Sequence, residues 1–219
     1  MTATVIGATG LIGSYLVKIL KKDNFFSTTR LLVRRPLEVK NENVEVRLID
    51  FNDTESFKLG IEGSDAVFCT IGTTKEKVRG DKEAYRKVDF DIPIKAAQFC
   101  KETGCSNFIL VSSVGADSGN KNFYLQLKGE VEDAVRQMNI ESVTIIRPSI
   151  LLGDRKESRP AETIGKFAMS LFSFALIGNA SKYKPIHAED VAQAMVNAAR
   201  NQQPGFTIYE YEEIKDLIR

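Results

Sequence analysis

The sequence has almost no excess of either charge and no long apolar run. Its 30 lysines and arginines nearly balance 29 aspartates and glutamates, so no basic field is available to hold nucleic acid or an anionic membrane surface. No apolar run reaches the roughly 18 residues of a membrane span. A β-rich run begins almost at Met1, which excludes an N-terminal secretory signal. We therefore expect a soluble cytoplasmic protein that binds no nucleic acid and has no transmembrane segment.

Cysteine is also scarce. The three cysteines, Cys69, Cys100 and Cys105, show no metal-like C-x-x-C spacing. An odd number of cysteines makes a poor disulfide framework. We expect three reduced thiols and no metal site.

The beginning of the chain contains a glycine fingerprint. A β-rich run over 2–7 enters glycines spaced G-x-x-G-x-x-G and leaves as a helix with an apolar period. Gly7 allows a tight turn, and Gly10 lets main-chain amides approach a pyrophosphate at the helix N-terminus. Gly13 lets the helix lie close to the strand. A glycine-rich turn without a ligand is the alternative, but the switch from strand to helix period favours a dinucleotide site.

The rest of the chain alternates β-rich and helical runs. Its 219 residues, 43% of them hydrophobic, can bury the core of one domain, 1–219. The alternation predicts an α/β fold, a doubly wound parallel sheet of the Rossmann, NAD(P)-binding type. The predicted strands are 2–7, 30–34, 44–49, 66–71, 107–112, 142–147 and a short one near 206–209; the predicted helices are 11–22, 54–59, 81–103, 122–138, 161–177, 188–200 and one at the end of the chain.

The alternation of predicted strands and helices changes after residue 147. We expect 148–219 to form a small C-terminal helical elaboration on the substrate side of the sheet, where open α/β sheets bind ligands. The apolar run 167–176 is too short to span a bilayer. A buried helix is the favoured interpretation, and a homodimer or membrane-surface contact is the alternative.

The end of the second predicted strand indicates which dinucleotide is bound. An acidic residue here would accept hydrogen bonds from the adenosine ribose, whereas arginine accommodates a 2′-phosphate. The strand ends in Arg34 and Arg35, whose guanidinium groups pair well with phosphate, so we expect NADPH/NADP as the cofactor. A solvated basic turn is the alternative. Asp50, after the third strand, is placed either to accept from the adenine amino group or to cap the helix near Thr54.

The fourth and fifth strands lead to the predicted chemistry. Ile71 and Gly72 let main chain approach the middle of the cofactor. Ser113 ends the fifth strand, and Tyr124 and Lys128 follow four residues apart on one face of a helix. Since a free phenol has a pKa of about 10, catalysis needs a cation that stabilises the phenolate, which Lys128 supplies. The lysine could also hold the nicotinamide ribose, and Ser113 could hydrogen-bond the substrate carbonyl.

Together these motifs resemble the short-chain dehydrogenase/reductase superfamily in its extended or atypical branch. More narrowly, nearly the whole chain is similar to the Tat-interacting protein family of NADPH-binding oxidoreductases. The runs that carry this likeness are F-C-T-I-G-T-T (68–74), S-S-V-G-A-D (112–117), Y-L-Q-L-K-G-E-V-E (124–132) and R-P-S-I-L-L-G-D-R-K-E-S-R-P (147–160). The resemblance implies cofactor contacts at Thr9, Gly10, Leu11, Ile12, Arg34, Arg35, Ile71, Gly72, Tyr124, Lys128, Leu151 and Arg159.

Two functions are compatible with these motifs. The first is an NADPH-dependent oxidoreductase, a reductase whose substrate is a small carbonyl compound. The short gap from Ser113 to Tyr124 and the small C-terminal part make a sugar nucleotide less expected. The second is an NADP(H)-binding regulator that contacts a protein partner according to its cofactor state, with little or no turnover. The serine, tyrosine and lysine set favours the enzyme, and it leaves the single histidine, His187, a structural role.

Overall fold

Seven parallel strands form the central sheet of the computed structural model, which describes residues 1–153 and 178–219. Their order across the sheet is β3-β2-β1-β4-β5-β6-β9. The first six positions follow the 3-2-1-4-5-6 order of a doubly wound dinucleotide-binding sheet, so the predicted fold class is confirmed. The strands are β1 (Thr2–Ile6), β2 (Thr28–Val33), β3 (Val44–Leu48), β4 (Ala66–Cys69), β5 (Asn107–Val111), β6 (Ser142–Ile146) and β9 (Gly205–Tyr209).

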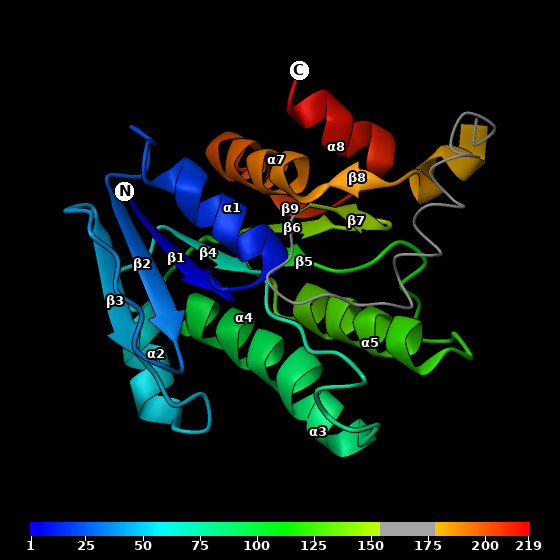
Figure 1. Ribbon diagram of the computed structural model, residues 1–219, viewed down its shortest axis with the longest axis horizontal. Coiled ribbons are helices and arrows are strands. Elements are labelled where there is room, and N and C mark those ends of the chain that lie inside the picture. The colour runs from blue at the N-terminus through cyan, green and yellow to red at the C-terminus, as the bar shows by residue number, and fades with distance from the viewer. Residues whose placement is uncertain (154–177) are drawn as a thin grey trace.

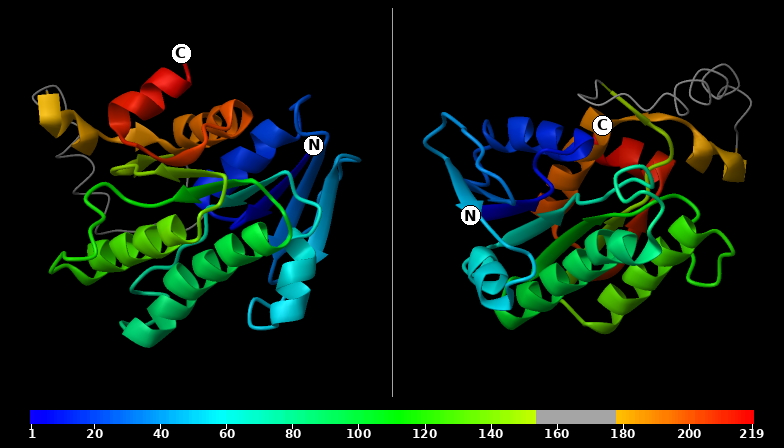
Figure 2. Two further views of the ribbon diagram at one scale, coloured as in Figure 1. Left: turned by 180° about the vertical axis from the view of Figure 1, so that it is seen from behind. Right: turned by 60° about the horizontal axis from the view of Figure 1, so that its bottom comes forward.

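Helices cover both faces of this sheet (Figures 1 and 2). One face carries α1 (Leu11–Leu20), α7 (Ala188–Asn201) and α8 (Tyr211–Leu217). The other carries α2 (Thr54–Ile61), α4 (Ile92–Glu102) and α5 (Phe123–Gln137). The predicted helix 81–103 consists of α3 (Lys82–Arg86), the π-helical turn η1 (Lys87–Asp91) and α4.

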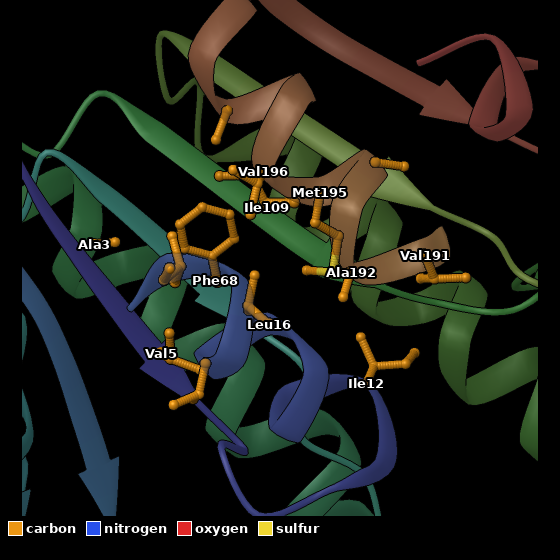
Figure 3. Packing of buried hydrophobic residues seen from close by; sticks show 14 of the residues in the cluster. Ala3, Val5, Ile12, Leu16, Phe68, Ile109, Val191, Ala192, Met195 and Val196 are labelled. Carbon is orange, nitrogen blue, oxygen red and sulfur yellow. The ribbon is translucent and has the colours of Figure 1, made fainter. Parts of the chain in front are cut away.

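Two apolar clusters lie between the sheet and its helices. Successive side chains of a strand point to opposite faces, so Val5 joins the cluster under α1 and α7, and Ile6 joins the cluster under α2 and α4. Figure 3 shows Leu16 of α1 and Met195 of α7 on the same side of the sheet as Phe68 of β4. Burying a side chain of this size stabilises the fold by roughly 1.5 to 3 kcal/mol.

Asparagine or aspartate side chains cap the N-termini of several helices. Asp53 accepts hydrogen bonds from the amides of Glu55 and Ser56 and caps α2. Asn122 caps α5 in the same way, through the amides of Tyr124 and Leu125. Such caps contribute about 1 kcal/mol each and set where a helix starts. The start of α5 in turn sets which face of that helix Tyr124 and Lys128 occupy.

The chain after β6 adds to both the sheet and the helical layer. β7 (Leu151–Leu152) pairs with β8 (Ile186–His187), the 3-10 turn η3 spans Gly178–Tyr183, and β9 extends the sheet beside β6. The predicted helix 161–177, with its apolar run 167–176, lies outside the described residues, so the extent of the C-terminal elaboration stays a prediction. None of the helices in 1–153 and 178–219 has the length and apolar character that a bilayer crossing needs.

Candidate functional site

The glycine fingerprint forms the turn between β1 and α1. Gly7 has φ of 91°, in the region that favours glycine, and its carbonyl oxygen accepts from the Gly10 amide at 2.9 Å. A β-carbon on Gly13 would lie 2.1 Å from that same oxygen. The first turn of α1 therefore lies directly against β1. Its amides at Leu11 and Ile12 have no intrahelical acceptor and no side-chain cap, and such a helix N-terminus favours anions.

Thr70 holds this turn from the neighbouring strand. Its hydroxyl donates to the carbonyl oxygens of Ile6 and Gly7 at 3.1 and 3.2 Å. Thr9 and Gly10 are exposed at the mouth of the turn. A phosphate group could approach there without displacing a side chain of the turn.

Arg34 and Arg35 follow β2, the strand next to β1, and both are exposed. Since β1 and β2 are parallel, their carboxyl ends meet at the same edge of the sheet. The two guanidinium groups are thus one strand away from the glycine turn. The structure brings together the residues that the sequence assigned to the phosphate end of the cofactor.

Asp50 has a local role that differs from one of its two predicted roles. Its Oδ1 accepts from the backbone and side-chain amides of Asn52, both at 2.9 Å. The cap of α2 is Asp53 instead. The predicted capping role of Asp50 is therefore wrong, because α2 begins at Thr54 and the residue directly before it, Asp53, supplies the cap. Contact of Asp50 with adenine stays a prediction.

A buried carboxylate lies where β4 ends. Asp89, on η1, is 1% exposed and accepts from the Thr73 amide at 2.7 Å through Oδ2. Its Oδ1 accepts from Lys128 Nζ at 3.1 Å. A β-carbon on Gly72 would stand 3.4 Å from the same Oδ1, so this main chain lies close to the carboxylate. Ile71 is half-buried beside it and packs against the apolar cluster of that face.

Tyr124 and Lys128 meet on α5 as their spacing predicted. The Lys128 ammonium lies 5.8 Å from the centroid of the Tyr124 ring. Lys128 is 6% exposed and Tyr124 is 38% exposed, so the lysine is covered while the tyrosine faces outward. Burial by itself would lower the pKa of Lys128, but the charge of Asp89 and its hydrogen bond outweigh this and raise the pKa above its usual value.

The two serines after β5 have different surroundings. Ser112 is buried and donates to the carboxylate of Glu132, which is itself 2% exposed and held by Arg147. Ser113 is half-buried, and its hydroxyl contacts only the carbonyl oxygen of Val114, at 3.4 Å, within the described residues. Of the two hydroxyls, that of Ser112 is bound to a buried carboxylate, and the predicted role of Ser113 toward a substrate stays a prediction.

Leu151, His187 and Arg159 belong to the C-terminal part of the chain. Leu151 is half-buried in β7 and packs against the cluster under α1. A β-carbon on Gly153, two residues later, would lie 3.2 Å from the Leu11 side chain. This loop thus reaches the N-terminus of α1. His187 is exposed and occupies the N-cap position of α7 without a side-chain cap bond. Arg159 lies outside the described residues.

All three cysteines are buried free thiols. Burial raises the pKa of Cys69 to about 12, which makes it inert beside the candidate site. No group of three or more potential metal ligands occurs in the described ranges.

Two partners in this site were missed by sequence reasoning. Asp89 and Glu132 bind cations that are distant in sequence, and neither belongs to the quoted catalytic pattern. Their only sequence signal is an acidic residue within an apolar helical period. Lys128 and Glu132 are four residues apart on α5, a spacing at which opposite charges can pair. In the structure Lys128 pairs with Asp89 instead, and Glu132 pairs with Arg147.

Comparison with known proteins decides the family. The family model described as NAD(P)H-binding matches residues 7–202. The chain belongs to this NAD(P)H-binding family. Membership supports a nicotinamide dinucleotide as the ligand, and the match begins at Gly7, the first glycine of the turn.

Curated relatives agree with this assignment. Rat protein HTATIP2 is 38% identical over 165 residues, which are 74% of this chain and 67% of that protein. Protein FMP52, mitochondrial, of Candida albicans is 32% identical over 227 residues, covering all of this chain and 93% of the relative. The resemblance predicted from the motifs is confirmed. A cytoplasmic location stays a prediction.

Solved structures support the fold. MoeE5 in complex with UDP-glucose and NAD has a TM-score of 0.71 at 16% identity, covering 98% of this chain and 79% of its own. UDP-N-acetylglucosamine 4-epimerase from Methanobrevibacter ruminantium M1 has a TM-score of 0.72 at 19% identity, covering 95% and 76%. At this identity the likeness concerns the NAD(P)-binding Rossmann fold alone.

Proposed function

We propose that the protein is an NADPH-dependent oxidoreductase that reduces a small carbonyl compound. The observation that carries this proposal is the covered ammonium of Lys128 behind the outward-facing phenol of Tyr124. A lysine kept charged next to a tyrosine is the arrangement that proton transfer from a phenol needs. A protein that only bound the dinucleotide would have no need of it.

The donors at the sheet edge fit a dinucleotide phosphate. The amides of Leu11 and Ile12 at the N-terminus of α1 favour an anion there. Arg34 and Arg35 add two guanidinium groups at the end of β2. No acidic residue occupies the place of the arginines, which supports NADPH over NADH. Main chain at Gly72 would lie along the middle of the cofactor.

The mechanism assigns one role to each side chain. When bound, the reduced nicotinamide supplies a hydride to the carbonyl carbon. Tyr124 gives its phenolic proton to the carbonyl oxygen as the C=O bond becomes an alcohol C–O bond, and the Lys128 ammonium stabilises the phenolate that remains. Ser113 donates a hydrogen bond to the same oxygen while negative charge grows on it. Solvent returns the proton to Tyr124, which is 38% exposed.

A small substrate fits the way in which the loop after β5 is held. The Asp117 amide donates to the carbonyl oxygen of Leu125, and the Ser118 hydroxyl donates to Asp133 at 2.6 Å. A β-carbon on Gly129 would lie 2.1 Å from the Ser118 amide nitrogen, so loop and helix are in direct main-chain contact. The loop therefore lies on α5 rather than extending outward to enclose a large substrate.

Cofactor choice is tested by titrating NADPH and NADH against the protein. We expect NADPH to bind roughly 10-fold more tightly, because a partly exposed charge-assisted hydrogen bond is worth about 1.5 kcal/mol. Arg34→Glu combined with Arg35→Glu should remove the preference and leave NADH affinity nearly unchanged. Equal affinities in the wild type would contradict the role of the arginines.

Chemistry is tested by Tyr124→Phe and Lys128→Ala with a panel of aldehydes, ketones and quinones. Tyr124→Phe should abolish reduction and keep NADPH affinity within a few fold, since the hydroxyl acts chiefly in the transition state. Lys128→Ala should lose both, because the ammonium is expected to orient the ribose as well. If Tyr124→Phe turned over at the wild-type rate, the regulator alternative would become the better account.

A further inference from the structure

The C-terminal end of α4 brings two of the three cysteines together. Gly104, two residues after the end of α4, has φ of 79°. The Cys105 amide donates to the Cys100 carbonyl oxygen at 2.9 Å. The Gly104 amide donates to the Lys101 carbonyl oxygen at 3.3 Å. These two bonds form a Schellman motif, which frequently carries a contact between the side chains at the positions of Cys100 and Cys105.

The hydrogen bonds of the two thiols show this contact. The Cys100 thiol donates to the Cys105 carbonyl oxygen at 3.3 Å, and the Cys105 thiol donates to the Asn107 carbonyl oxygen at 3.6 Å. The Asn107 oxygen also lies 4.0 Å from the Cys100 sulfur. Both side chains thus meet around one carbonyl oxygen, in the apolar cluster under α2 and α4. A disulfide needs side chains that face each other without movement of the backbone.

The contact makes the two thiols unequal. A hydrogen bond from the Cys100 thiol to the Cys105 sulfur lowers the pKa of Cys105, and it outweighs the opposite effect of burial. The same hydrogen bond, together with burial, raises the pKa of Cys100. Cys105 is 4% exposed, whereas Cys100 is fully buried. Because the thiolate is the nucleophilic form of cysteine, Cys105 is the more reactive of the two.

The two cysteines lie away from the candidate site. Cys105 comes two residues before β5 begins at Asn107, whereas Ser113 follows the other end of that strand. The proposed reduction of a carbonyl compound therefore uses neither Cys100 nor Cys105, and chemistry at these thiols is a separate property of the chain.

We propose that Cys100 and Cys105 form a redox-active pair, which a small hydroperoxide oxidises to a disulfide. Cys105 is the attacking thiolate, and Cys100 is the thiol that resolves the intermediate. The oxidant has to be small, because only a molecule close to water in size reaches a sulfur that belongs to a residue 4% exposed. Larger thiol reagents reach the pair only when the chain unfolds.

The reaction balances in two steps. The Cys105 sulfur attacks one peroxide oxygen, so that an S–O bond forms, the O–O bond breaks, and the hydroxide that leaves takes up the Cys105 proton as water. The Cys100 sulfur then attacks the Cys105 sulfur of this sulfenic acid. An S–S bond forms, the S–O bond breaks, and the second hydroxide leaves with the Cys100 proton as water. Two thiols thus lose two electrons and two protons, and one peroxide is reduced to two waters.

The test treats the native protein with excess hydrogen peroxide, removes the oxidant, and alkylates the remaining thiols after unfolding. Lys95, Lys101 and Lys121 place the two cysteines in separate tryptic peptides, 96–101 and 102–121. We expect mass spectrometry of the unreduced digest to show these peptides joined, with the loss of two hydrogen atoms. Dithiothreitol should separate them again.

Two variants and one melting curve test the assigned roles. Cys100→Ala lacks the resolving thiol, so Cys105 should stop at the sulfenic acid, which dimedone traps. Cys105→Ala should leave Cys100 reduced, because burial keeps this thiol protonated. Melting curves of both reduced variants show whether they are folded. In wild type the disulfide should raise the melting temperature by roughly 4 to 8 °C, because it closes a short loop in the unfolded chain.

Cys69 is the internal control in every digest. It is also buried, and burial raises its pKa to about 12, so it should stay reduced. Oxidation of Cys69 at the same rate as Cys105 would indicate unfolding and would overturn the proposal. Peptides 96–101 and 102–121 that remained unlinked would overturn it as well, whether Cys105 stayed reduced or became a sulfinic acid. A disulfide that lowered the melting temperature would refute the contact between the two side chains. None of these results depends on NADPH binding, so they are independent of the proposed function.

Discussion

Gly13→Ala tests the contact on which the dinucleotide site depends. The added carbon would lie 2.1 Å from the Gly7 oxygen, 2.8 Å from the Gly7 carbonyl carbon and 2.9 Å from the Thr70 hydroxyl oxygen. Ordinary van der Waals contact begins near 3.5 Å. The two nearest atoms belong to the backbone of Gly7, so rotation of a side chain cannot relieve the overlap. The start of α1 must move away from Gly7 by roughly 1.4 Å to reach ordinary contact.

Two effects oppose each other at this position. Alanine is favoured over glycine within a helix by about 1 kcal/mol. Overpacking against a backbone that cannot yield costs roughly 3 kcal/mol. The net loss of about 2 kcal/mol corresponds to a fall in melting temperature of roughly 4 to 8 °C for a chain of this size. The shift of the Leu11 and Ile12 amides should also weaken NADPH binding by about 10-fold.

Thermal unfolding with and without NADPH measures both effects. The control is Gly119→Ala, where the nearest atom to the new carbon is a side-chain oxygen of Asp117 at 3.5 Å and the contact is ordinary. The control should melt with the wild type. A Gly13→Ala protein with the wild-type melting temperature and the wild-type NADPH affinity would refute the predicted clash with Gly7.

Three further predictions concern buried polar groups. Glu132→Gln should lower the free energy of unfolding by about 3 kcal/mol in denaturant titrations, because Arg147 would lose its buried counter-charge; Glu130→Gln, at the more exposed pair with Arg86, should change it by less than about 1 kcal/mol. Gly129→Ala should lower both stability and turnover, since the new carbon would meet the backbone of Asp117 and Ser118; wild-type values of either would count against the close contact of loop and helix. A thiol reagent at neutral pH should modify Cys69, Cys100 and Cys105 only after unfolding, as all three are buried; fast labelling of the native protein would contradict this.

Local pattern was enough to predict the elements and much of the candidate site. The glycine turn, the arginines at the end of β2 and the four-residue spacing of Tyr124 and Lys128 are all set by neighbours in sequence. A period of 2 or 3.6 residues fixes which side chains share a face. The seven strands of the central sheet begin and end within two residues of the predicted ones, whereas the two-residue strands β7 and β8 were not predicted.

Partners distant in sequence were decided only by the tertiary structure. Lys128 binds Asp89 across 39 residues because the sheet order places β4 next to β5, and because a π-helical turn directs the carboxylate to that edge. The same packing binds Ser112 to the buried carboxylate of Glu132, whereas the Ser113 hydroxyl contacts the carbonyl oxygen of Val114. A local period cannot predict such pairs, because they depend on the register of the strands and on how the helices pack on the sheet. The glycine turn, the strand ends and the shared face of a helix depend only on residues close in sequence.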